Sequence, residues 1–168
     1  VGQAVAGRLG RSLLELGGNN GIIVTPSADL DLAMRAVVFA AAGTSGHRCT
    51  SLRRLIVHQS IADEFVPRIV EAYKSIQIGV PWEDGVLLGP LVNEQAVRQY
   101  ESAMATIQQQ GGEILTGGNR IDRPGCFVEP TIVRAQPDMA IDSEETFAPI
   151  LYVLEYDALE EAIATHNS

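Results

Sequence analysis

Residues 29–58 read DLDLAMRAVVFAAAGTSGHRCTSLRRLIVH, and they join three kinds of local structure. Asp29 is of a residue type preferred at helix N-caps, and apolar residues recur after it at helical spacing as far as Ala42. A loop of small residues follows over Gly43–Thr50, and the branched side chains of Arg53–His58 are typical of a strand. A helix that leads into a strand through a short loop is a building unit of α/β domains.

The same alternation continues on both sides of this segment. Upstream, a helix begins at Val1 and closes at Gly10, and two short buried strands follow at Ser12–Leu16 and Ile22–Val24. Downstream, we expect a helix capped by Ser60, a helix over Asn93–Gln110, strands at Glu113–Thr116, Thr131–Val133 and Ile150–Leu154, and a last helix with a capping box of Asp157 and Glu160. This alternation predicts an α/β fold with a mostly parallel sheet covered by helices.

The length and charge of the chain narrow the class of protein. It has 168 residues, a length typical of one domain, and its 12 basic and 21 acidic residues give a net charge of −9. The charges are scattered, without the basic patch of a nucleic-acid-binding protein. The longest apolar stretch, Ala36–Gly43, is too short to span a bilayer, and no leader-like segment precedes it. These features favour a cytoplasmic domain without nucleic-acid or membrane partners.

The two cysteines, Cys49 and Cys126, occur without a CxxC pattern, so no metal site or disulfide framework is expected. Cys49 stands in the loop Gly43–Thr50 beside Arg48 and after a helix end, where a nucleophile has access and positive potential. The alternative is a buried structural cysteine, because free cysteine is among the most buried residue types. We expect Cys126 to be structural.

Two carboxylates also stand at element boundaries. Glu15 lies between Leu14 and Leu16 at the end of a predicted strand, where burial would suit it as a general base. The alternative is a solvated side chain on an edge strand. Glu145 precedes the last predicted strand, where it could hold a ribose while Phe147 lies against a flat cofactor. The alternative there is a solvated acidic residue followed by a core phenylalanine.

Taken together, these segments resemble the aldehyde dehydrogenase superfamily, whose motifs are a Leu-Glu-Leu-Gly-Gly strand, a Gly-x-x-Cys loop and a Glu-x-Phe-x-Pro segment. All three occur in the family order, at Leu14–Gly18, Gly46–Cys49 and Glu145–Pro149. The resemblance extends over the whole chain and is strongest to the antiquitin branch, the α-aminoadipic semialdehyde (piperideine-6-carboxylate) dehydrogenases. The segments that carry this similarity are Gly10–Asn20, Arg48–Leu55, Asp122–Gly125 and Glu145–Val153.

The resemblance implies a reaction and a role for each residue. Cys49 would attack the aldehyde carbonyl, a hydride would leave the adduct for NAD, and Glu15 would activate the water that hydrolyses the thioester to a free acid. Glu145 would hold the nicotinamide ribose, Phe147 would lie beside the ring, and the backbone of Leu16–Gly17 would border the nicotinamide. NADP is the alternative cofactor.

The resemblance also implies a substrate. In the antiquitin branch an arginine before the nucleophile binds the carboxylate at the far end of the substrate. Arg48 stands in that place, with Thr50 as a second expected substrate-site residue. The expected substrate is therefore α-aminoadipic semialdehyde, in lysine degradation. The alternative for Arg48 is a structural ion pair or thiolate stabilisation.

Two other functions stay open at this point. His47 replaces the glutamine common in the branch, and a histidine so close to Cys49 is compatible with a cysteine hydrolase. No orienting Asn or Asp is recognisable, which makes this alternative the weaker one. The second alternative is a non-catalytic structural or oligomerisation module on the same fold.

The resemblance finally implies that these residues belong to a longer chain. Residues 1–18 would be the tail end of the coenzyme-binding domain, with Glu15 on its strand, and residues 19–168 would be a catalytic cysteine domain truncated at its C-terminus. The phosphate-binding loop and the asparagine of the oxyanion hole would lie outside these residues. Because one donor of the oxyanion hole would be missing, we expect these residues alone to be inactive. The resemblance also implies that the full-length enzyme is a homo-oligomer, a dimer or tetramer.

Overall fold

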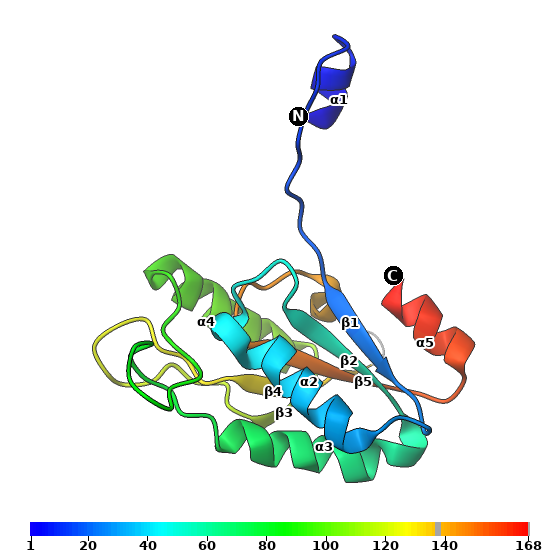
Figure 1. The fold of residues 1–168 in the computed structure, drawn as a ribbon, viewed down its shortest axis with the longest axis vertical. Coiled ribbons are helices and arrows are strands. Elements are labelled where there is room, and N and C mark those ends of the chain that lie inside the picture. Colours follow the sequence, from blue (N-terminus) through cyan, green and yellow to red (C-terminus); the bar gives the residue numbers. More distant parts are fainter. Residues whose placement is uncertain (137–138, 168) are drawn as a thin grey trace.

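The computed structural model describes residues 1–136 and 139–167, which form a five-stranded sheet with helices on both faces (Figure 1). The strands lie in the order β1-β2-β5-β4-β3. Their bounds are Asn20–Val24 (β1), Leu52–His58 (β2), Glu113–Thr116 (β3), Thr131–Arg134 (β4) and Ile150–Tyr156 (β5). Each neighbouring pair is parallel except β3 and β4, which are antiparallel. The predicted α/β fold with a mostly parallel sheet is confirmed.

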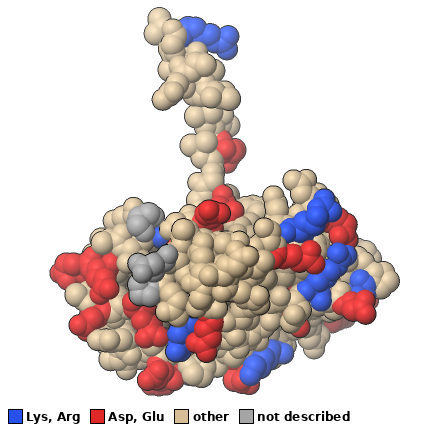
Figure 2. Space-filling view, turned by 180° about the vertical axis from the view of Figure 1, so that it is seen from behind, with Lys and Arg blue, Asp and Glu red and all other residues tan. Residues whose placement is uncertain are grey.

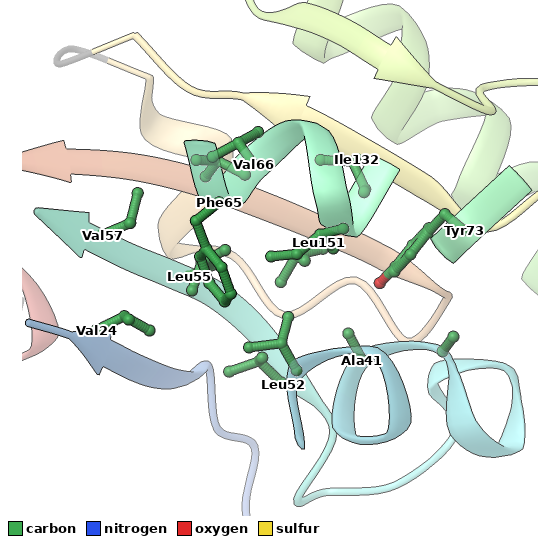
Figure 3. Close-up of a cluster of buried hydrophobic side chains, with 14 of the residues drawn as sticks. Val24, Ala41, Leu52, Leu55, Val57, Phe65, Val66, Tyr73, Ile132 and Leu151 are labelled. Carbon is green, nitrogen blue, oxygen red and sulfur yellow. The ribbon is translucent and has the colours of Figure 1, made fainter. Parts of the chain in front are cut away.

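The helices cover both faces of this sheet. On one face, Leu55 of β2 and Phe65 of α3 are fully buried in a cluster that also includes α2 (Figure 3). On the other face, α4 packs against Tyr152 of β5, and Ala162 of α5 packs against Ile56 of β2. Because successive residues of a strand point to opposite faces, β2 is buried on both sides. The helix bounds are Gly2–Ala6 (α1), Leu30–Ala42 (α2), Gln59–Lys74 (α3), Glu94–Gln109 (α4) and Leu159–His166 (α5).

Side-chain caps confirm two of the predicted helix starts. Oδ1 of Asp29 accepts the backbone N–H groups of Asp31 and Leu32, each over 3.0 Å. Oδ1 of Asn93 accepts the N–H of Ala96 over 3.0 Å. These bonds satisfy backbone donors that have no partner inside the first turn of a helix.

Two other predicted starts are wrong. His58 rather than Ser60 caps α3, because Nδ1 of His58 accepts the N–H of Ser60 over 3.1 Å. At α5, Glu161 rather than Glu160 reaches back to the N–H of Asp157, over 3.2 Å. At α3 the strand β2 ends at His58, directly before the helix, so the last strand residue takes the capping position. At α5 the N-cap is Ala158, which has no side chain that could cap the helix.

Residues 1–19 form an arm that projects from the body of the molecule and carries α1 (Figure 1). The strand predicted over Ser12–Leu16 is wrong, because none of these residues pairs with a strand in the described part of the chain. Leu13 and Leu16 are 91% and 75% exposed. A strand needs a neighbour to satisfy its backbone groups, and an apolar sequence alone does not supply one.

The surface of the body is mixed in charge. Acidic and basic side chains lie next to one another over the face seen from behind (Figure 2). Among the described residues, no helix has both the length and the apolar character that crossing a membrane requires.

Candidate active site

The loop that carries Cys49 has a backbone conformation that few residues adopt. Thr44, Ser45 and Gly46 have φ values of 55°, 54° and 71°. A Cβ added to Gly46 would stand 2.3 Å from the carbonyl oxygen of Ala148. The positive φ and the close approach both favour glycine at this position. The loop is therefore pressed onto the segment before β5.

Asn20 fixes the backbone on both sides of the cysteine. Its Nδ2 donates to the carbonyl oxygen of Cys49 at a distance of 2.6 Å and to that of Ser51 at 3.0 Å. Arg48 and Ser51 are joined by two hydrogen bonds. The N–H of Arg48 donates to Oγ of Ser51 at a distance of 3.1 Å, and the N–H of Ser51 donates to the carbonyl oxygen of Arg48 at 3.0 Å. The Cys49 thiol itself is free and exposed. The alternative of a buried structural cysteine is therefore wrong, and the sulfur has the access that a nucleophile needs.

A buried arginine ties this loop to the segment before β5. Arg53 lies on β2 and is 1% exposed. Its guanidinium donates to the carbonyl oxygens of Ser51, over 2.9 Å, and Thr146, over 3.2 Å. It also donates to the carbonyl oxygens of Gly46 and Arg48, both at a distance of 3.4 Å. The planar guanidinium of Arg53 thus binds backbone carbonyls of both the cysteine loop and the segment before β5.

The same guanidinium lies against an acidic and an aromatic side chain. Nη2 of Arg53 is 3.4 Å from Oε1 of Glu145, and the guanidinium carbon is 5.2 Å from the centre of the Phe147 ring. Desolvation lowers the pKa of Arg53, whereas the charges of Glu145 and Cys49 raise it. Arginine stays protonated in proteins, so Arg53 supplies positive charge to the carboxylate and to the cysteine.

The other oxygen of Glu145 meets the arm where the arm joins the body. The N–H of Gly18 donates to Oε2 of Glu145 over 3.1 Å. A Cβ added to Gly17 would stand 2.5 Å from the same oxygen. Glycine at this position leaves room for the carboxylate. The three segments that stand out in the sequence therefore meet at one place in the structure.

The Phe147 ring borders a groove beside this carboxylate. It is 41% exposed, and it stacks on the His47 ring with the two centroids 5.7 Å apart and the planes 18° from parallel. The groove has a volume of about 420 Å³ and is lined by Glu145, Phe147 and residues of α4, including Gln99 and Ser102. An exposed ring next to a carboxylate suits a flat ligand that carries hydroxyl groups.

The whole chain matches a known family. Residues 1–168 match the model of the aldehyde dehydrogenase family. The chain belongs to this family. It is 48% identical to aldehyde dehydrogenase family 7 member A1 of Brassica napus and 49% identical to α-aminoadipic semialdehyde dehydrogenase of Bos taurus. These alignments include 100% and 99% of the chain but 34% and 31% of the relatives, so the chain spans about a third of their length. The predicted resemblance to the α-aminoadipic semialdehyde dehydrogenases is confirmed.

Solved structures of the family have the same fold over these residues. The chain matches betaine aldehyde dehydrogenase of Staphylococcus aureus, solved in complex with NAD⁺, with a TM-score of 0.93 at 30% identity. It matches lactaldehyde dehydrogenase of Escherichia coli with a TM-score of 0.92 at 36% identity. The matches cover 99% and 97% of the chain, and 34% and 35% of those two proteins.

In this aldehyde dehydrogenase chain, Glu15 lies in surroundings that differ from the prediction. The sequence predicts a buried carboxylate, but Glu15 is exposed, and Leu14 and Leu16 beside it are 43% and 75% exposed. Among the described residues, no hydrogen bond or ion pair involves its side chain. The prediction of burial is wrong because the strand that would bury Glu15 does not form. Its role as a base stays a prediction.

Arg48 and Thr50, the predicted substrate residues, flank Cys49. Thr50 is exposed. Nη2 of Arg48 donates to the carbonyl oxygen of Phe39 over 3.3 Å, and its guanidinium carbon lies 5.3 Å from the Phe39 ring. The side chain thus interacts with the last turns of α2, where a cation is favourable. Among the described residues no ion pair involves Arg48, so its contacts with Phe39 differ from the ion pair that was the alternative. The substrate role of Arg48 stays a prediction.

The residues around Glu145 fit a nicotinamide nucleotide. Because Gly17 has no side chain, the Glu145 carboxylate can lie close to the backbone of the arm, where an added Cβ would stand 2.5 Å from Oε2. Phe147 keeps part of its ring exposed beside that carboxylate. A carboxylate can accept hydrogen bonds from ribose hydroxyls, and a ring can pack against a nicotinamide. In the described part of the chain, no cluster of His, Cys, Asp and Glu could hold a metal ion.

Sequence reasoning missed Arg53, Asn20 and the role of His47 beside Phe147. The signal for Arg53 is present, because two arginines stand in the apolar strand LRRLIVH and a buried arginine requires partners. The partners are carbonyl oxygens of loops, which the sequence does not identify. No local pattern in the sequence indicates that Asn20 holds the cysteine loop.

Proposed function

We propose that this chain carries the nucleophile and part of the nicotinamide-binding surface of an NAD(P)-dependent aldehyde dehydrogenase. The observation that carries the proposal is the meeting of Gly18, the Cys49 loop and Glu145 around the buried Arg53. The proposed substrate is an aldehyde with a carboxylate at its far end, of the α-aminoadipic semialdehyde type. The α-aminoadipic semialdehyde dehydrogenases of Bos taurus and Mus musculus, 49% and 48% identical to the chain, support this class.

Cys49 performs the first step. Its thiolate adds to the carbonyl carbon of the aldehyde, a C–S bond forms, and the carbonyl electron pair moves to the oxygen. The backbone N–H of Cys49 is the donor that this chain contributes to the resulting oxyanion. Asn20 and Arg53 hold the loop backbone during this step, through the carbonyls of Cys49 and Arg48 respectively.

Glu145 and Phe147 position the cofactor. A bound NAD(P)⁺ would supply the hydride acceptor that this oxidation of the Cys49 adduct to a thioester needs. Arg53 and Gly18 each hold one oxygen of the Glu145 carboxylate, which orients it toward ribose hydroxyls. Phe147 and the backbone of Leu16 and Gly17 would be the groups of this chain that border the nicotinamide.

Glu15 completes the reaction. It takes a proton from water, the resulting hydroxide adds to the thioester carbon, and the C–S bond breaks to release the acid and the Cys49 thiolate. The net change is aldehyde, NAD(P)⁺ and water to carboxylic acid, NAD(P)H and a proton. This step requires the arm to place Glu15 within hydrogen-bond reach of a water beside Cys49.

A cysteine hydrolase is the weaker candidate. Such an enzyme needs a base hydrogen-bonded to the thiol. The His47 ring stacks on Phe147 instead, and its Nε2 has no hydrogen-bond partner. In the part of the chain that the structure describes, no hydrogen bond joins a histidine ring to Cys49.

The test measures NADH formation from α-aminoadipic semialdehyde by the full-length protein that contains these residues. We expect turnover that falls about 10⁴-fold or more in Cys49→Ser, because the nucleophile is lost. We expect the 168-residue chain alone to show little or none. A folded full-length protein without turnover contradicts the proposal. A non-catalytic module would also leave the Cys49→Ser variant equal to the parent protein.

A further inference from the structure

The Phe147 ring contacts two nitrogen-containing side chains that come from different parts of the chain. His47 belongs to the cysteine loop and stacks on the ring at 5.7 Å between centroids. Arg53 belongs to β2 and places its guanidinium carbon 5.2 Å from the ring centre. Phe147 is nevertheless 41% exposed, so these two contacts fix a ring that borders an open groove.

His47 is held in its neutral form by its surroundings. Burial and the charge of Arg53 lower the pKa of His47 from its ordinary value of 6.5, and a hydrogen bond to the backbone of Phe147 raises it by less. Its Nε2 is buried, and no described residue forms a hydrogen bond with it. Protonation would therefore add an unpaired N–H and a second cation beside Arg53.

Within residues 1–136 and 139–167, the elements packed around His47 offer no compensating negative charge. On the side of α4, a cavity of about 140 Å³ lies between His47 and the side chains of Asn93, Gln95 and Gln99, and its lining also includes Val92, Ala96 and Phe147. In the segment that carries Phe147, Glu145 is ion-paired to Arg53. On the loop of His47 itself, Arg48 is a further cation and Cys49 is exposed. Among the residues that the structure describes, a charged His47 imidazole would therefore have no carboxylate partner of its own.

We infer that neutral His47 is a positioning residue that holds Phe147 against the cofactor groove, and that protonation of His47 releases the ring. The inference rests on the proposed function, because it assigns Phe147 to the nicotinamide side of that site. Its direction with pH follows from linkage. A histidine whose pKa is lowered in the folded state binds fewer protons than the free imidazole, so the stacked arrangement is stable above pH 6.5 and weakens as the pH falls below that value.

The experiment measures kcat and the KM for NAD⁺ of the full-length enzyme between about pH 5.5 and pH 8. In the parent enzyme we expect the KM to rise about fivefold to tenfold at the acid end, with a smaller change in kcat. In His47→Gln the flat amide does not titrate, so the KM should be nearly independent of pH. In His47→Ala the KM should be raised at every pH.

The control is His58→Gln, which removes a histidine that contacts another aromatic residue, Tyr156, edge to face. This variant should keep the pH dependence of the parent. If His47→Gln follows the same KM curve as the parent, the inference is overturned while the turnover still supports the proposed function.

If the parent enzyme has no turnover, the proposed function fails, and NMR tests His47 separately. Contacts between the His47 and Phe147 ring protons that are present near pH 7.5 and lost near pH 5.5 support the positioning role. Contacts that persist unchanged at both values overturn it.

Discussion

Gly18 donates its backbone N–H to Oε2 of Glu145 over 3.1 Å, although 127 positions separate the two residues in the chain. Oε1 of the same carboxylate is 3.4 Å from Nη2 of Arg53. The carboxylate is therefore held at both oxygens, once by the arm and once by β2. A group held in this way presents its remaining lone pairs in a fixed direction.

Gly17→Ala should weaken cofactor binding without much loss of stability. The added Cβ would stand 2.5 Å from Oε2 of Glu145, which is the end of a flexible side chain and can move away. We expect the KM for NAD⁺ of the full-length enzyme to rise about tenfold, or ~1.4 kcal/mol, and the free energy of unfolding to change by less than about 1 kcal/mol. Gly7→Ala is the control, because its Cβ would meet nothing closer than 3.5 Å. An unchanged KM would show that Glu145 does not hold the cofactor.

Gly46→Ala should destabilise the fold itself. Its Cβ would stand 2.3 Å from a backbone atom, the carbonyl oxygen of Ala148, which cannot move without the loop. Gly111→Ala is a matched control, because its φ of 79° is also positive and, among the described residues, the nearest atom to its Cβ would be Cγ of Gln136 at 3.9 Å. Urea unfolding should give a loss of about 1–2 kcal/mol for Gly111→Ala and about 3–5 kcal/mol for Gly46→Ala. If both variants lost the same free energy of unfolding, the close approach of Gly46 to the Ala148 carbonyl would be contradicted.

Some of this structure can be predicted from the sequence because it is determined locally. Asp29 and Asn93 begin helices because each side chain bonds to donors two or three residues away. The order of helices and strands then gives the α/β fold. Ser12–Leu16 shows the limit of such local reasoning, since its apolar composition is that of a strand but a strand also needs a neighbour.

The candidate site could be predicted only through its motifs. Resemblance to a family brings Gly17, Cys49 and Glu145 together, whereas spacing alone does not. The contacts that organise the site are beyond either kind of reasoning. Arg53 is buried because carbonyls from two loops converge on it, and such convergence depends on the folded path of both loops.

The two cysteines should differ in their rate of alkylation. Cys49 is exposed, whereas desolvation and then the charge of Glu94 raise the pKa of Cys126 and keep it in the thiol form at neutral pH. Iodoacetamide at about pH 7.5 should modify Cys49 at least about tenfold faster, as followed by mass spectrometry of the two peptides. Glu94→Gln should make the alkylation rates of the two cysteines more similar, because it removes one cause of the raised pKa of Cys126. Equal alkylation rates of Cys49 and Cys126 in the parent chain would contradict the prediction that Cys49 is the more reactive thiol.

Arg53→Met should slow the alkylation of Cys49, whereas Arg54→Met should not. Arg53 and Arg54 are neighbours on β2 and are 1% and 5% exposed, so both substitutions should destabilise the chain, by about 3 kcal/mol. Arg54 holds the carbonyls of Asn19 and His166, over 2.8 and 3.0 Å, and so serves the packing of α5. Of these two arginines, Arg53 is the one whose charge interacts with Cys49. An effect of about 1 kcal/mol corresponds to a rate about fivefold lower.

Arg53→Lys separates charge from geometry in the same measurement. Lysine keeps the positive charge but cannot hold the carbonyls of Gly46, Arg48, Ser51 and Thr146 together, so the alkylation rate should recover further than the KM for NAD⁺. Thermal unfolding of each variant, recorded in parallel, identifies losses that follow from unfolding alone. An alkylation rate that falls equally in Arg53→Met and Arg54→Met would mean that Arg53 acts on Cys49 only through general stability.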